Sequence, residues 1–169
     1  MKSKETDTKE RERTDGRLLI IGYGNPLRSD DGVGWLIAKN LANVIGGSAT
    51  VLAVHQLTPD LAKAISEADL VIFIDACYEG APGTWQCETI RGALAPSQTF
   101  AHYLTPETLL IYVRAVYNVE PAALLVSVAG GSFEYGQNLS PSVAATVPDI
   151  VSTLYEWWRA SARTLETAT

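Results

Sequence analysis

Short apolar runs alternate with segments of helical periodicity along most of this chain. The clearest run, 70–74, holds five apolar residues in a row between Asp69 and Asp75, which is typical of a strand covered on both faces. Other segments repeat their apolar residues at spacings of three and four, as amphipathic helices do. These patterns predict strands at 17–23, 49–55, 69–75, 84–90 and 122–129, and helices at 30–44, 58–68, 105–117 and 140–163.

Several helix ends carry residues with known capping preferences. Gly46 and Gly47 follow the first helical segment and should end it. Thr58-Pro59 and Thr105-Pro106 should begin later helices, because threonine caps and proline suits the first turn. Since strands alternate with helices, the predicted class is α/β, a three-layer α/β/α sandwich with a mostly parallel sheet of about five strands. The alternating segment 84–90 is expected to be its one antiparallel edge strand.

Composition narrows the function classes. The 169 residues suffice for one domain, which we place at 17–165, whereas the nearly all-polar segment 1–16 is expected to be a disordered tail. The net charge of −6 argues against nucleic acid as a partner. No apolar run approaches the roughly 20 residues of a membrane span, and no apolar signal core follows the charged start, so we expect a cytoplasmic protein. We also expect it to be a monomer. Cys77 and Cys87 fit no zinc spacing.

The loop after the first strand carries the most distinctive chemistry. Its glycines at 22 and 24 suggest a dinucleotide site, but Leu27 occupies the third glycine position and no acidic residue ends the next strand. Asp30 and Asp31 would also repel a pyrophosphate. The loop therefore suits a cation better, at the carboxyl edge of a parallel sheet where ligands bind. We interpret Asp30 as a structural helix cap.

Two more candidate ligands lie downstream. Asp75 ends the third strand and should reach the same edge as Asp31, and His102 precedes a predicted helix. Each residue also has a plainer interpretation: Asp31 could favour a helix dipole, Asp75 could cap a turn, and His102 could be an ordinary solvated histidine. Tyr23, Asn25 and Arg28 could line the same cleft, which the sequence does not decide.

The segment 22–34, GYGNPLRSDDGVG, resembles the opening signature of the hydrogenase maturation endopeptidases. These enzymes remove a C-terminal extension from the large subunit of nickel–iron hydrogenases. The resemblance extends over about 18–163 and implies that Asp31, Asp75 and His102 are both the catalytic and the metal-contacting residues. Asp75 lies in the context IDACYEG and His102 in FAHYLTPETLL. Oxygen and nitrogen ligands of this kind suit a divalent transition ion such as nickel.

The resemblance also implies the partner and the cofactor. The partner is a large-subunit precursor, and the nickel is carried by that precursor, with another divalent metal able to replace it in vitro. Many relatives have an Asp-Gly-x-Thr type segment where this chain has His55, Gln56, Leu57 and Thr58. This departure resembles the subgroup that matures bidirectional, NAD(P)-linked hydrogenases. We therefore assign these four residues to substrate recognition, with an ordinary loop as the alternative.

The sequence contains neither a G-x-S-x-G elbow nor an H-E-x-x-H pair. A metal-assisted endopeptidase, in which metal or a carboxylate activates water, is therefore the expected mechanism. A nickel-binding chaperone or sensing module of hydrogenase assembly would keep the same ligands without proteolysis. A generic nucleotide-binding α/β domain is a second alternative.

Overall fold

A computed structural model describes residues 17–93 and 104–166 of the chain. The predicted tail at 1–16 and the candidate ligand His102 lie outside the described residues. The strands are β1 (Leu18–Tyr23), β2 (Thr50–Val54), β3 (Leu70–Cys77), β4 (Trp85–Ile90) and β5 (Ala122–Ala129). The helices are η1 (Ser29–Gly32), α1 (Val33–Ile45), η2 (Gly46–Ser48), α2 (Leu61–Ser66), α3 (Pro106–Tyr117) and α4 (Pro141–Glu166), where η marks a 3-10 helix.

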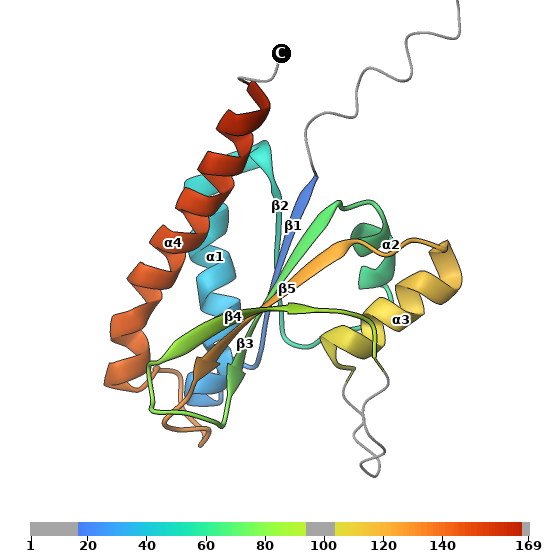
Figure 1. Ribbon diagram of the computed structural model, residues 1–169. Coiled ribbons are helices and arrows are strands. Elements are labelled where there is room, and N and C mark those ends of the chain that lie inside the picture. Colours follow the sequence, from blue (N-terminus) through green and yellow to red (C-terminus); the bar gives the residue numbers. More distant parts are fainter. Residues whose placement is uncertain (1–16, 94–103, 167–169) are drawn as a thin grey trace, which may run out of the picture.

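The five strands form one sheet in the order β2-β1-β3-β5-β4. All neighbours are parallel except β4, which pairs antiparallel with β5 at the edge. The predicted mostly parallel α/β sheet with one antiparallel edge strand is thus confirmed. Figure 1 shows α1 and α4 on one side of the sheet and α2 and α3 on the other, which completes three layers.

Alternation along each strand separates two apolar cores. Ile20, Ile72 and Ile74 face α1 and α4, whereas Leu19 and Phe73 face α2 and α3. Because successive side chains of a strand point to opposite faces, a buried central strand needs apolar residues at every position. This requirement explains the unbroken apolar run in β3, which lies between β1 and β5.

The predicted helix boundaries at Gly46 and Thr105 are confirmed. Gly46 follows α1 with a φ of 66°, a backbone conformation that favours glycine. The Thr105 side chain accepts a hydrogen bond from the Thr108 N–H at 3.2 Å, and Pro106 begins α3. The Thr105 cap and Pro106 therefore fix the residue at which α3 begins.

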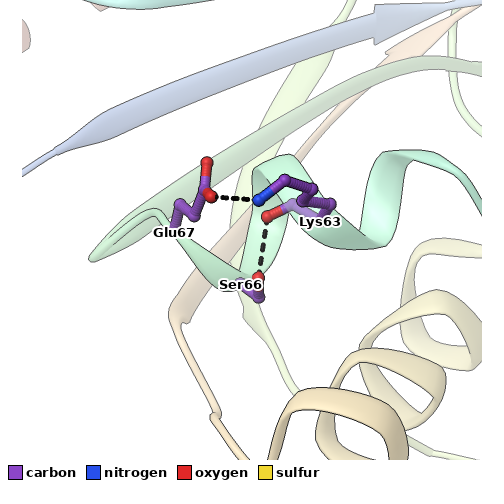
Figure 2. A network of polar contacts seen from close by, with 3 residues as sticks. All are labelled: Lys63, Ser66 and Glu67. Atoms are coloured by element: carbon purple, nitrogen blue, oxygen red, sulfur yellow. Dashed lines mark hydrogen bonds and ion pairs between the residues drawn. The ribbon is translucent and has the colours of Figure 1, made fainter.

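The short helix α2 has its own surface network (Figure 2). The Lys63 ammonium lies 2.6 Å from a carboxylate oxygen of Glu67, one turn along, and the Ser66 hydroxyl donates to the Lys63 carbonyl. Exposed pairs of this kind contribute little to stability, so burial of Leu61, Ala62 and Ile65 holds α2 on the sheet. Within the described part of the chain, no helix combines the length and apolar character needed to cross a bilayer.

Candidate active site at the carboxyl edge of the sheet

The loop between β1 and α1 holds Asp31 in a fixed position. Its carboxylate Oδ2 accepts a hydrogen bond from the Asn25 N–H at 2.9 Å. Gly24 has a φ of 135°, and a methyl group there would lie 1.8 Å from the Asp31 carbonyl oxygen. Only glycine fits both the backbone angle and the close approach, so the second glycine of the signature folds the loop back onto Asp31.

A second close approach brings this loop to β3. A methyl group at Gly34 would lie 2.2 Å from the Ile74 carbonyl oxygen and 2.6 Å from that of Tyr23. The first turn of α1 therefore presses directly on the ends of β1 and β3. After β1 the chain passes to β2 on one side of β1, and β3 lies on the other side of β1. The carboxyl ends of β1 and β3 therefore form the switch point in the strand order, where open α/β sheets bind ligands.

Asp75 is half-buried at this switch point. Its Oδ1 accepts from the Ala76 N–H at 2.8 Å. Burial raises the pKa of Asp75 to about 7; the Tyr23 hydroxyl and the Ala76 N–H oppose this rise, and the negative charge of Asp31 adds to it. Burial, followed by the charge of Asp75, raises the pKa of Tyr23 far above its usual value. The structure thus brings Asp31, Asp75 and Tyr23 together.

The raised pKa of Asp75 predicts a pH effect on stability. The native state holds this proton up to about pH 7, whereas the unfolded carboxyl loses it near pH 4. The stabilisation is therefore complete below about pH 4 and is lost as the pH rises to about 7. We expect Asp75→Asn, which removes the ionisable group, to gain stability relative to the wild type between pH 5 and pH 8.

Urea unfolding at pH 5, 6, 7 and 8 would measure this difference. Asp149→Asn, on the exposed face of α4, is the matched control and should show no such trend. A difference between Asp75→Asn and the wild type that stays constant with pH would contradict the pKa assignment.

The described residues supply two of the three expected metal contacts. Within 17–93 and 104–166, no three His, Cys, Asp or Glu residues are grouped so that they could hold a metal ion. The third candidate, His102, lies outside this part of the chain. Leu104 packs against the same core cluster as Tyr23, and Glu107 acts electrostatically on Tyr23, so the chain begins α3 beside the acidic pair.

Asp30 has a structural role, but the predicted role as a helix cap is wrong. Gly32 is the N-cap of α1 and makes no side-chain cap bond, and η1 has none either. The fully buried carboxylate of Asp30 instead accepts hydrogen bonds of 2.7–2.9 Å from the N–H groups of Gly131, Ser132 and Ser140 and from the Ser140 hydroxyl. Burial alone would raise the pKa of Asp30, but these hydrogen bonds lower it.

The role of the 131–136 loop, which the Asp30 carboxylate ties to the site, was not predicted from the sequence. Ser29 takes a left-handed φ of 50°, and its N–H and hydroxyl bind the carbonyls of Gly136 and Glu134. Such backbone conformations cluster at functional sites. The adjacent glycines Gly130 and Gly131 are the one sequence signal that marked this loop as unusual.

The segment 55–58, which is predicted to recognise the substrate, has an exposed first half and a more buried second half. His55 and Gln56 follow β2 and are exposed at the same edge as Asp31, whereas Leu57 is 5% exposed within the core. Thr58 is half-buried, and its carbonyl accepts from the Leu61 N–H. The Gly24 N–H donates to the Val54 carbonyl at 3.3 Å, which joins the end of β2 to the Asp31 loop.

A cavity of about 340 Å³ lies elsewhere, where β4 ends and β5 begins. Its lining includes Ile90, Leu110 and Ala123. Because β5 runs parallel to β1 and β3, its start lies at the edge of the sheet opposite Asp31 and Asp75. The cavity is thus separate from the acidic pair.

The fold and this site define an α/β protein with a pair of acidic residues at the sheet's switch point. The sequence matches no protein-family model and no curated protein. Among solved structures, the chain is similar to the [NiFe] hydrogenase maturation protease HycI of Thermococcus kodakarensis KOD1, with a TM-score of 0.72 and 20% identity over 85% of this chain and 93% of that one.

Two structures from Escherichia coli are also similar. The hydrogenase maturating endopeptidase HybD has a TM-score of 0.69 and 22% identity, over 86% of this chain and 93% of that one. The solution structure of an endopeptidase has a TM-score of 0.67 and 21% identity, over the same shares. These likenesses establish a shared fold.

Proposed function

We propose that the chain is an endopeptidase that removes the C-terminal extension from the nickel-loaded large-subunit precursor of a [NiFe] hydrogenase. The observation that carries this proposal is the meeting of Asp31 and Asp75 at the switch point, within a fold shared with hydrogenase maturation proteases. The sequence resemblance at 22–34 supports the same conclusion independently. The enzyme is proposed to act as a cytoplasmic monomer.

In this proposal Asp31, Asp75 and His102 recognise the nickel ion that the precursor brings. Carboxylate oxygens and an imidazole nitrogen are suitable donors for such an ion. The ion or a carboxylate then activates a water molecule against the scissile carbonyl. The half-buried position of Asp75 limits competition from bulk water for its oxygens, which favours a contact made only when the precursor docks.

The decisive test is incubation of the purified chain with the large-subunit precursor, with and without nickel. Mass spectrometry should show loss of the C-terminal extension only from the nickel-loaded precursor. Nickel-dependent binding without a mass change would indicate the chaperone or sensing alternative instead. Protection by a nucleotide against heat unfolding would point to the nucleotide-binding alternative.

We further propose that His55 and Gln56 select the hydrogenase, as expected for the subgroup that acts on bidirectional, NAD(P)-linked enzymes. Because Leu57 belongs to the core, the exchange should be limited to His55→Asp with Gln56→Gly. We expect the variant to process the cognate precursor more slowly, since a misplaced charge at a desolvated contact costs about 2–5 kcal/mol.

A competition between a bidirectional-type and an uptake-type precursor would measure the change in preference. Ser152→Asp adds one negative charge to the exposed face of α4 and is the matched control. Wild-type rates and ratios in the exchanged variant would show that the segment is an ordinary loop.

A further inference from the structure

Four large side chains lie on the loops that follow β1, β3 and β5, and we call them the aromatic ridge: Leu27, Tyr78, Phe133 and Tyr135. Tyr135 is 90% exposed, Tyr78 76% and Leu27 47%. The rings of Tyr78 and Phe133 pack with centroids 4.1 Å apart. Exposed aromatic residues gathered in this way are typical of binding surfaces rather than of inert ones.

Part of the ridge lies on the segments that carry the acidic pair. Tyr78 directly follows β3, three positions after Asp75, and Leu27 lies in the loop that carries Asp31. The Gly136 N–H donates to the Leu27 carbonyl at 3.0 Å, and the Arg28 guanidinium donates to the Phe133 carbonyl at 3.3 Å. A molecule seated on the ridge would therefore lie against the segments that carry Asp31 and Asp75.

The loop that carries Phe133 and Tyr135 is held in place by the Asp30 network. The Asp30 carboxylate receives donors from both ends of the 131–140 segment, and the Asp30 N–H donates to the Ser132 carbonyl at 3.0 Å. Gly130 leaves room for Phe133, because a methyl group there would lie 2.5 Å from its ring. A loop backbone fixed in this way loses little conformational entropy on binding, which favours its use as a binding surface.

We propose that the aromatic ridge docks an apolar segment of the precursor polypeptide next to the bond that is cleaved, which rests on the proposed function. A second copy of this chain is a poorer occupant, because a dimer formed through the ridge would cover the adjoining acidic pair and block the site. A polypeptide substrate, in contrast, has to occupy the ridge and the site together. Two acidic side chains beside the ridge, Glu79 and Glu134, outweigh the positive charge of Arg28 there and favour a segment that also carries positive charge.

The test compares Tyr78→Ser combined with Tyr135→Ser against the wild type in processing the nickel-loaded precursor. Both tyrosines are exposed, so the double variant should keep the wild-type melting temperature. We expect KM to rise by about 10-fold or more while kcat at saturating precursor stays within about 2-fold. This result would mean that the two tyrosines bind the precursor equally well in the ground state and in the transition state. Tyr117→Ser, 40% exposed at the far end of α3, is the matched control and should leave KM unchanged.

The outcomes separate this proposal from the proposed function. If the wild type processes the precursor and the double variant has the same KM, the ridge proposal is wrong and the proposed function stands. If the wild type neither binds nor processes the precursor, both are wrong. Light scattering gives a further check: a wild-type dimer that the double variant converts to monomer would assign the ridge to self-association and overturn the proposal.

Discussion

Asp31→Ala is expected to lower the rate of precursor processing by roughly 100-fold or more while the protein stays folded. Loss of groups that only support a metal ligand typically costs 10–100-fold, so loss of a direct ligand should cost at least as much. Asp31 is half-buried, and its carboxylate accepts a hydrogen bond from the Asn25 N–H in its own loop. The fold of the sheet does not depend on it.

A second variant separates charge from loop geometry. Asp31→Asn retains an oxygen that can accept from the Asn25 N–H, so the loop should keep its shape, whereas the negative charge offered to the ion is lost. We expect Asp31→Asn to lose processing nearly as completely as Asp31→Ala. Asp75→Ala and His102→Ala should show the same loss if the three residues share the ion.

The measurement is a single-turnover time course of the precursor mass shift at fixed nickel loading. Asp60→Ala is the matched control, because Asp60 is an exposed aspartate that follows β2 and precedes α2 at the same edge of the sheet. Circular dichroism would verify folding of each variant. Full processing by Asp31→Ala would remove this residue from the metal-contacting set.

Asp30→Ala is expected to lower the free energy of unfolding by roughly 3–5 kcal/mol, because several hydrogen-bond donors lose their common acceptor. Four donors lose their acceptor in this variant: the N–H groups of Gly131, Ser132 and Ser140 and the Ser140 hydroxyl. Each unsatisfied buried donor carries a desolvation cost of about 1–3 kcal/mol, and water entering the cavity would recover part of it. Asp30 is 0% exposed, so little water reaches it in the wild type.

The same residue should make the wild type sensitive to acid. The folded-state pKa of Asp30 lies below its usual value, so its stabilisation is complete above about pH 4 and is lost as the pH falls through the folded-state pKa. We expect the gap in stability between the wild type and Asp30→Asn to narrow below about pH 4. Asparagine keeps the volume of the side chain but turns an amide toward the donors.

Urea unfolding at pH 7 and at pH 3–4 would measure both effects. Asp149→Ala, which removes an exposed aspartate from α4, is the control and should change stability by less than about 0.5 kcal/mol. If Asp30→Ala changed stability no more than this control, the network around Asp30 would not hold the loop as described.

Much of the fold could be predicted from the sequence, because the relevant physics is local. The apolar run in β3 reports burial on both faces, and the cap at Thr105 and the stop at Gly46 depend on the residues beside them. The class of the sheet followed from the alternation of strands and helices. Because Asp31 follows one predicted strand and Asp75 ends another, the sequence also predicted that both would reach one edge.

Other features depended on contacts that cross the chain. Asp30 and Asp31 are neighbours in sequence and both precede α1, yet one is buried as the anchor of a loop and the other faces the site. The partners of Asp30 lie 101–110 positions away, and no local preference encodes that distance. The same holds for the recognition segment, in which packing buried Leu57 and left His55 exposed.

The sequence by itself thus determined the elements, their order and the acidic residues at the strand ends, because period, capping and turn preferences act over a few residues. The tertiary structure alone decided which acid is a structural anchor, that Tyr23 lies against Asp75, and that Tyr78 and Phe133 meet beside the site. These outcomes depend on where parallel strands end and on how closely glycine lets α1 approach them. Such distances are set by packing of the whole sheet and not by any one segment.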